Sequence, residues 1–255
     1  MSVLAATTTS TSPPSITIAF WSFDYNTREL YNTGLDGVLV GDPTYTTSRL
    51  GYGAAISLNQ SSSQFVSITT RNVPLNSRSF TIEAWIYPIA LTVVDYGIFG
   101  QCQSEDTNLC FHFLSRNIKL YCGFWGNDVS GATILTMNVW THVACVYDSA
   151  TFTQQVWLNR VLDGSRSASA YQGTSGAISI GLWSHEYFNG YINEVRFEAR
   201  AKTANELLND ATLFVYYSLD DGSLIDDSFN GIKGTVSGNI TMTAGRVNQA
   251  IQFTL

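Results

Sequence analysis

The chain has 255 residues, of which 45% are hydrophobic and 13% are charged, and its formal net charge is −7. This composition is typical of a globular protein with a large core, and it argues against an intrinsically disordered chain. The negative charge also argues against nucleic acid and anionic lipid as partners, since both require a basic surface. The sequence lacks an apolar run of about 18 residues, so we expect no membrane insertion.

Residues 1–14 are rich in Thr, Ser and Pro, and they lack the basic start and the apolar centre of a signal peptide. Such a composition is typical of linkers between extracellular modules, so we expect a linker here. Sequons at Asn59 and Asn239 are candidate N-glycosylation sites, and they agree with a secreted protein.

Alternation of apolar and polar residues dominates the rest of the sequence. In residues 80–88, Phe80 and Ile82 share one face of an extended chain, while Glu83 and Trp85 share the other. Similar segments, separated by Gly, Asn, Asp and Ser, follow at 97–102, 109–115, 118–125, 142–148, 153–159, 177–182 and 191–199. Many short strands of this kind predict an all-β sandwich, barrel or jelly roll.

A single segment near the end of this region carries a helical signal. Thr203 and Glu206 have the spacing of a capping box. In this motif each side chain accepts a hydrogen bond from the backbone N–H of the other residue. The motif predicts one short helix of about two turns over residues 203–210.

Four cysteines allow three disulfide pairings. We favour Cys102–Cys110 together with Cys122–Cys145, because the first bond would clamp the loop between two segments that resemble neighbouring strands. The alternative is that some of these residues are buried free thiols, since cysteine also behaves as a small hydrophobic residue.

The sequence repeats itself at a period of about 195 residues, which is typical of tandem domains rather than of a solenoid. The repeat pairs Asp24 with Asp220 and, farther along, Ile56 with Ile251. We therefore expect three parts: the linker over 1–14, a complete domain over 15–212, and the N-terminal fragment of a second copy over 213–255.

Three segments together identify a family resemblance. They are "SFTIEAWIYP" at 79–88, "VWTHVACVYD" at 139–148 and "GYINEVRFEARAKTANEL" at 190–207. In this order they resemble the laminin G-like group of the concanavalin A-like lectin and glucanase superfamily. The resemblance implies an antiparallel jelly-roll sandwich of two curved sheets, common in extracellular adhesion and matrix proteins.

Within this framework, several conspicuous residues have a structural interpretation. We expect Trp85 and Trp140 to fill the interior of the sandwich, because both carry a large apolar area. Glu83 shares a face with Trp85, so it needs a partner if it is buried. We expect His142 to be structural, because no nucleophile or carboxylate stands at a spacing that would suggest catalysis.

The resemblance also implies a calcium site, since many related domains bind Ca²⁺ at the rim of the sandwich through carboxylates and carbonyls. The matching residues are Asp24, Asn26 and Asp36, with Asn193 in the position that usually holds Asp. That replacement removes one negative charge and weakens the prediction. The alternative is that the first three are turn residues that form local hydrogen bonds.

Two loops combine aromatic and polar residues beside strand ends, at 124–131 and 182–190. Aromatic faces stack on sugar rings, and loops on a rigid β scaffold commonly carry binding sites. The alternative, which we rank higher, is that these aromatic residues close the ends of the sandwich. The candidate ligand-binding residues are Phe124, Trp125, Asn127, Asp128, Trp183, His185, Glu186 and Tyr187.

Hydrolysis of glycosides requires two carboxylates about 5 Å apart in retaining enzymes. Glu194 and Glu198 are the nearest match, but Arg196 stands between them on the same predicted face and the central Asp of related glucanases is missing. This pattern is typical of an exposed salt-bridge ladder.

We therefore expect a non-catalytic, extracellular binding or adhesion module that recognises a glycan or a protein through rim loops, with calcium as an aid. The alternative is a structural protein that self-associates by donating a strand from residues 213–255 to a neighbour. Glycoside hydrolysis ranks third.

Overall fold

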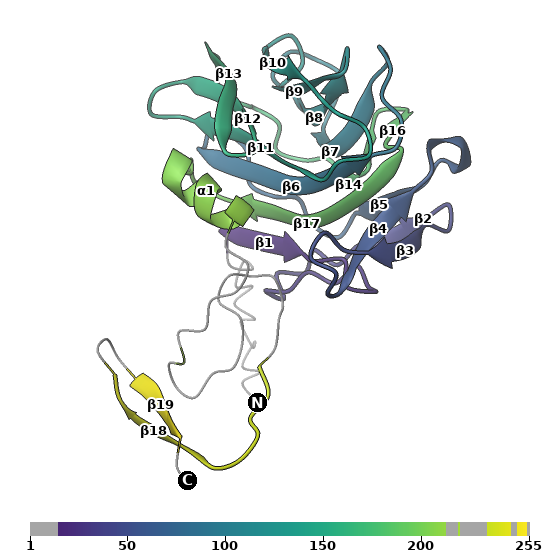
Figure 1. Cartoon of the computed structure of the whole chain (residues 1–255). Helices are drawn as coiled ribbons and strands as arrows, with labels where there is room; N and C mark the ends of the chain where they lie inside the picture. Colours follow the sequence, from purple (N-terminus) through teal and green to yellow (C-terminus); the bar gives the residue numbers. More distant parts are fainter. Residues whose placement is uncertain (1–14, 213–218, 220–233, 246–248, 254–255) are drawn as a thin grey trace, which may run out of the picture.

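The computed structural model describes every residue except 1–14, 213–218, 220–233, 246–248 and 254–255. The predicted linker and the opening strand of the predicted second copy lie outside the described residues. Two large antiparallel sheets packed face to face make up most of the structure (Figure 1), which confirms the predicted jelly-roll sandwich.

The first sheet has eight strands. Seven of them lie in the order β13 (Val161–Ser167), β12 (Thr153–Leu158), β11 (Thr141–Asp148), β6 (Phe80–Pro88), β17 (Gly190–Glu198), β4 (Ala54–Leu58) and β3 (Thr44–Thr47). The eighth, β1 (Ile18–Trp21), pairs with the C-terminal half of β17, whereas β4 pairs with its N-terminal half. One edge of β17 is therefore shared between two shorter strands.

The second sheet has seven strands. Their order is β10 (Asp128–Ile134), β9 (Lys119–Gly123), β8 (Cys110–Arg116), β7 (Tyr96–Cys102), β14 (Ile178–Ile180), β5 (Phe65–Ile68) and β2 (Val38–Val40). The smaller elements are the hairpins β15 (Leu182–Trp183)–β16 (Glu186–Tyr187) and β18 (Ile240–Ala244)–β19 (Gln249–Phe253), the 3₁₀ turn η1 (Gln60–Ser62) and the helix α1 (Ala204–Thr212).

The core between the sheets follows from the alternation in the sequence. The ring of Phe80, from the inward face of β6, meets that of Phe111 from β8 edge to face at 5.4 Å. At the N-terminal end of the sandwich, the buried Trp21 donates its indole Nε1 to the backbone oxygen of Leu35 at 2.8 Å. Edge-to-face pairs of this kind add to the stabilisation from buried apolar area.

Trp85 and Trp140 do not fill this interior, so the prediction for them is wrong. Both are partly exposed on the outer face of the eight-stranded sheet. The guanidinium of Arg49 stacks 3.9 Å from the Trp85 ring, and Trp140 lies 5.5 Å from the ring of Tyr87. Residues an odd number of positions apart on a strand point to opposite faces of the sheet. Because Phe80 points into the core, Trp85 must point to the outer face.

Both predicted disulfides are confirmed. Cys102–Cys110 joins the facing ends of β7 and β8, eight residues apart in the sequence. Cys122–Cys145 connects β9 of one sheet with β11 of the other, and both of its sulfur-bearing residues are fully buried. The second bond is therefore a covalent link across the core.

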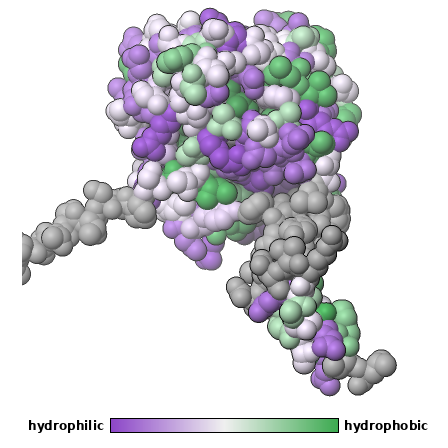
Figure 2. Space-filling model, turned by 90° about the vertical axis from the view of Figure 1, so that its left-hand side faces the viewer, coloured by the Kyte–Doolittle hydropathy of each residue, from purple (hydrophilic) through white to green (hydrophobic). Residues whose placement is uncertain are grey.

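The helix α1 begins with the predicted capping box. The backbone N–H of Thr203 donates to Glu206 Oε2 at 2.8 Å, and the Glu206 N–H donates to Thr203 Oγ1 at 3.4 Å. Leu207 is buried against Val146 and Trp157 on the outer face of the eight-stranded sheet. Viewed from the side of α1, the surface is mainly hydrophilic across its middle (Figure 2).

No helix in the described ranges combines the length and apolar character that a membrane crossing requires.

Candidate functional site

The two predicted ligand loops meet on the outer face of the seven-stranded sheet. Trp125 follows β9, Trp183 ends β15, and their ring centroids lie 5.9 Å apart. Trp125 is partly exposed, whereas Trp183 is only 8% exposed and packs with Cys110 and Leu114 of β8. Residues far apart in the sequence thus form one aromatic surface, which we call the aromatic platform (Trp125, Trp183 and Tyr121).

Alternate residues of β8 form the surface beneath the platform. Phe111 and Phe113 point into the core, and the intervening His112 and the later Arg116 point outward. Tyr121 comes from the neighbouring β9, with its ring stacked at 11° to that of His112. Alternation along β8 predicts that these residues point outward, but it does not distinguish a binding site from an ordinary outer face.

Glycine at position 97 allows the β15–β16 hairpin to lie against β7. A Cβ atom on Gly97 would stand 2.2 Å from the backbone nitrogen of Trp183, which is far inside van der Waals contact. The backbones of the hairpin and β7 are therefore in close contact at Gly97. This contact places the Trp183 ring beside the ring of His112.

Gly97→Ala is expected to destabilise the protein by about 1–3 kcal/mol, because backbone atoms of the hairpin must move away from β7. The change should also redshift tryptophan fluorescence as Trp183 becomes exposed. Gly100→Ala is the matched control: its closest contact is a side-chain oxygen, Ser179 Oγ, at 2.9 Å, which can rotate. Urea unfolding of both variants checks the prediction, and equal losses would contradict it.

A buried histidine and a carboxylate lie below the rings. His112 is 2% exposed, its ring lies 4.9 Å from that of Trp183, and its Nε2 stands 3.2 Å from Asp128 Oδ1. Burial acts to raise the pKa of Asp128, but the contacts with His112 and Tyr121 outweigh it and hold the pKa below its usual value. Asp128 is therefore an ionised acceptor at neutral pH.

A cation borders the platform on the side of Tyr121. The Arg116 guanidinium lies 4.5 Å from the Tyr121 ring centroid and donates through Nε to Asp95 Oδ1 at 2.8 Å. The hydrogen bond to Asp95 is the main cause of a raised pKa at Arg116. Arg116 is thus permanently charged and held in place beside the rings.

Several buried polar atoms around the platform lack a hydrogen-bond partner among the described residues. They include Trp183 Nε1 and His112 Nδ1. Buried polar groups in folded proteins nearly always have partners, so such a concentration marks unused hydrogen-bonding capacity. The site can therefore offer the partly exposed rings of Trp125 and Tyr121, a fixed positive charge and a carboxylate to a ligand.

The other predicted residues of the first loop serve the core and the loop itself. Phe124 is fully buried, with its ring 5.2 Å from that of Tyr147, so no face of the ring is open to a ligand. Asn127 is 8% exposed and donates to Asn108 Oδ1 at 2.8 Å and to Ser169 O at 3.0 Å.

The remaining residues of the second loop belong to the β15–β16 hairpin. His185 is exposed at its turn, and Glu186 and Tyr187 are partly exposed on β16. The Tyr187 ring lies 6.1 Å from that of Phe65, at the side of the hairpin that faces β5. All three flank the platform rather than form its rings.

The four predicted calcium ligands have different partners in the structure. Asp24 Oδ1 accepts a hydrogen bond from the first backbone N–H of β4 at 2.8 Å, and Asn26 Nδ2 donates to Asp24 O at 2.7 Å. Asp36 Oδ1 accepts a backbone N–H from its own loop at 2.8 Å. Asn193 is 2% exposed, and its Oδ1 has no partner in the part of the chain that the structure describes.

A β-bulge in β17 takes Glu194 out of the predicted salt-bridge ladder. The register shifts between Asn193 and Arg196, and Glu194 adopts φ +50°. Its carboxylate lies 3.7 Å from Arg49 Nη2, and burial raises the pKa of Glu194 to about 7. Arg196 lies 2.7 Å from Asp210 of α1.

A lysine neutralises a buried group of carboxylates under α1. Lys202 Nζ contacts Glu83 Oε1, and it lies 2.6 Å from Glu198 Oε1 and 2.7 Å from Asp210 Oδ2. Oxygens of these three acidic residues lie within 4.8 Å of one another, a spacing that a metal ion could bridge. The ammonium group, whose side chain is 1% exposed, takes that role.

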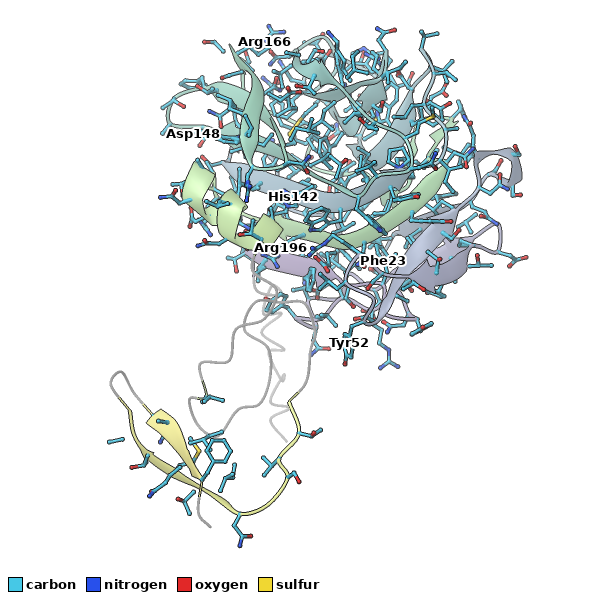
Figure 3. All side chains as sticks on the ribbon, viewed as in Figure 1. Phe23, Tyr52, His142, Asp148, Arg166 and Arg196 are labelled. Atoms are coloured by element: carbon cyan, nitrogen blue, oxygen red, sulfur yellow. A yellow bond between two sulfur atoms is a disulfide. The ribbon has the colours of Figure 1, made fainter. Side chains whose placement is uncertain are left out.

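Glu83 is the most buried carboxylate of this cluster, and its position beside Trp85 in the sequence suggested such burial. His142 Nε2 lies 3.2 Å from Glu83 Oε2, and Figure 3 shows His142 and Arg196 on the same side of the sheet, next to α1. Burial opposes ionisation of Glu83, but His142, Lys202 and Arg196 together hold its pKa well below the usual range. The structure thus supplies the partner that the sequence required and gives His142 a structural environment.

The fold resembles several solved structures. Domain 4 of AbnA, a GH43 extracellular arabinanase from Geobacillus stearothermophilus in complex with arabinotriose, matches with TM-score 0.61 and 19% identity, over 75% of this chain and 96% of that chain. The binding domain of Paraclostridial Mosquitocidal Protein 1 matches with TM-score 0.59 and 12% identity, over 90% and 61%.

A third structure, the binding domain of botulinum neurotoxin DC in complex with rat synaptotagmin II, matches with TM-score 0.58 and 12% identity, over 89% of this chain and 57% of that chain. The present chain thus spans about three fifths of the two toxin binding domains. At these identities the likeness shows the fold alone.

No curated protein matches the sequence. A laminin G domain model, described as concanavalin A-like lectin/glucanases superfamily, matches residues 60–208. This match covers more than half of the chain, and the two observed sheets agree with it. The chain therefore belongs to the concanavalin A-like lectin/glucanases superfamily.

Proposed function

We propose that this protein is a non-catalytic module that binds a glycan on the aromatic platform. The observation that carries the proposal is the convergence of Trp125, Trp183 and Tyr121 from separate segments, with Arg116 and Asp128 beside them. Pyranose rings present apolar C–H faces that stack on aromatic rings, while their hydroxyls bind charged and polar groups.

The carboxylates of the described region support binding rather than hydrolysis. Glu194 pairs with Arg49, and Glu198 pairs with Arg200 at 2.8 Å and with Lys202. A glycosidase requires one carboxyl group to donate a proton and a second to act as nucleophile or base on the opposite side of the sugar. Glu198 is held by two cations and is poorly suited to either task, and Glu194 alone does not supply the pair of carboxyl groups that the reaction requires.

Two further features extend the proposal. Disulfides form and persist in oxidising compartments, so the two observed bonds support an extracellular location. We also propose calcium as an aid to binding. Asn193 Oδ1 and the Asp24 carboxylate supply hard oxygen ligands of the kind that Ca²⁺ prefers, and Asn26 and Asp36 could complete the set.

Glycan binding is tested first on an array of neutral and sialylated oligosaccharides, and then by calorimetry with the strongest binder. Trp125→Ala is expected to weaken binding at least tenfold, which corresponds to about 1.4 kcal/mol. Trp140→Ala is the matched control, because Trp140 is also partly exposed but lies on the opposite sheet. It should leave the affinity unchanged.

Each titration is repeated with calcium and with a chelator, and Asp24→Asn should lose any calcium dependence. Affinity that is the same in both buffers would reject the role of calcium without affecting the platform. Equal losses for the two tryptophan variants, or no binding to any glycan on the array, would reject the platform as a sugar site.

A further inference from the structure

Two loops at one end of the sandwich are apolar and exposed, although surface loops usually consist of polar turn residues. One connects β6 with β7 and the other connects β10 with β11, and residues 86–94 and 134–140 contain no charged residue. Six apolar side chains of these segments are between 42% and 72% exposed. We call them the apolar rim: Ile89, Val93, Val94, Ile134, Met137 and Val139.

Hydrogen bonds hold the two loops together at the same end of the sandwich. The backbone N–H of Asn138, in the second loop, donates to Pro88 O at the start of the first loop at 2.8 Å. The first loop ends at Asp95, which accepts from Arg116 Nε at 2.8 Å, and the turn that follows Arg116 lies beside the last residues of β10. The rim is therefore one continuous surface.

The loops are anchored from below, so their exposed side chains are not needed for folding. Leu91 of the first loop and Leu135 of the second are buried in the core between the sheets. Single exposed apolar residues are ordinary on protein surfaces, but a contiguous group on fixed loops marks an interaction site.

Three aromatic residues border the rim on the outer face of the eight-stranded sheet. Tyr87 and Tyr191 stack 5.1 Å apart at 16°, and Trp140 lies 5.5 Å from the Tyr87 ring. All three are partly exposed, and Trp140 directly follows Val139 of the rim. Tryptophan and tyrosine are enriched where hydrocarbon meets water in membranes, because each combines an apolar ring with a polar group.

Two cations lie at the same end of the molecule. Lys119 stands opposite Ile134 in the β9–β10 pairing, and Arg160 belongs to the β12–β13 turn, which is joined to β11 by the Asn159 N–H that donates to His142 O at 2.8 Å. Neither cation has an ion pair with another described residue. Cationic side chains beside an apolar surface suit the phosphate groups of phospholipids.

We propose that the apolar rim docks the protein on the surface of a phospholipid bilayer. The rim side chains enter the boundary between headgroups and acyl chains, the three aromatic residues lie at headgroup level, and Lys119 and Arg160 contact lipid phosphates. Such docking is shallow and does not cross the bilayer. The net charge of −7 favours a zwitterionic surface, because an anionic one repels the rest of the chain.

The first experiment measures partition of the full chain onto phosphatidylcholine vesicles by flotation. Wild type should bind, and the binding should persist at high salt because the rim is uncharged. Val93→Asp should weaken partition by about tenfold or more, since the added charge must stay hydrated. Phe152→Asp is the matched control: Phe152 is 56% exposed, but it follows the opposite end of β11.

Trp140→Ala separates this proposal from glycan binding. It should weaken partition onto vesicles while leaving the affinity for the glycan unchanged. Trp125→Ala should show the reverse, because Trp125 follows the end of β9 that lies away from the rim. Failure of either proposal therefore leaves the other open to its own test. Loss of vesicle binding in Trp125→Ala, with Trp140→Ala unaffected, would assign the lipid contact to the platform and overturn the rim.

A fluorescent label checks which end of the sandwich meets the lipid. The four native cysteines form the two disulfides, so an added cysteine is the single free thiol. An environment-sensitive dye on Val94→Cys should shift to the blue when vesicles are added, whereas the same dye on Ala150→Cys, at the opposite end, should not. The proposal is overturned by wild type that stays off the vesicles, by equal losses for Val93→Asp and Phe152→Asp, or by equal shifts at 94 and 150.

Discussion

Replacement of Lys202 by methionine is expected to lower the free energy of unfolding by about 3–5 kcal/mol at neutral pH. Methionine keeps the length of the side chain but removes the ammonium from between Glu83, Glu198 and Asp210. The carboxylates would then repel one another in a site where Glu83 is 2% exposed. Removing one member of a buried ion pair is costly because it leaves the other charges uncompensated.

The loss should depend on pH in a definite direction. Burial opposes ionisation of Glu83, but its neighbours hold the pKa below the usual value of 4.5. A carboxyl group with a lowered pKa in the folded state stabilises the protein fully above its unfolded pKa, and this contribution is lost progressively as the pH falls from there through the lower folded pKa. The difference between wild type and Lys202→Met should therefore be largest near neutral pH and shrink in acid. Urea unfolding at pH 7 and at about pH 2.5 measures it.

Arg200→Met is the control for this prediction. Arg200 also pairs with Glu198, but its side chain is 49% exposed, so its removal should cost less than about 1 kcal/mol. A second variant, Lys202→Ala, leaves space among three carboxylates, and calcium should stabilise this variant more than it stabilises wild type. Equal losses for Lys202→Met and Arg200→Met would show that the cluster does not stabilise the fold.

The fold could be predicted because the alternation of residues is a local signal. From Phe80 onward each strand of the core repeats it, and the family resemblance then supplied the connectivity that alternation leaves open. The same signal placed Trp85 on the face of Glu83. The prediction that Trp85 fills the interior went against this signal and relied on side-chain size, and the structure follows the alternation.

The candidate site could be predicted only in part. Trp125 and Trp183 were found because aromatic residues stand beside turn residues in both loops. Their meeting depends on the close approach of the β15–β16 hairpin to Gly97, a contact between segments that lie far apart in the sequence. Lys202 gave no local signal either, because its contact with Glu83 spans 119 residues of sequence.

Loss of the Cys122–Cys145 disulfide is expected to be the second large effect. The double variant Cys122→Ala/Cys145→Ala should lower the free energy of unfolding by about 3–5 kcal/mol, because it opens a loop of 23 residues and leaves space in the core where both cysteines are fully buried. Urea unfolding without reductant measures the change. Cys102→Ala/Cys110→Ala is the comparison.

The bond between Cys102 and Cys110 closes a loop of only eight residues between strands that are already paired, so its loss should cost about 2 kcal/mol. These cysteines pack against Trp183, however, so their replacement should lower the affinity for the glycan. The accompanying loss in the free energy of unfolding should be small. The core disulfide should show the opposite pattern, a large loss of stability with unchanged affinity below the unfolding transition. The two variants therefore separate the interior of the sandwich from its binding face, and parallel losses in both measurements would show that the platform depends on the core as a whole.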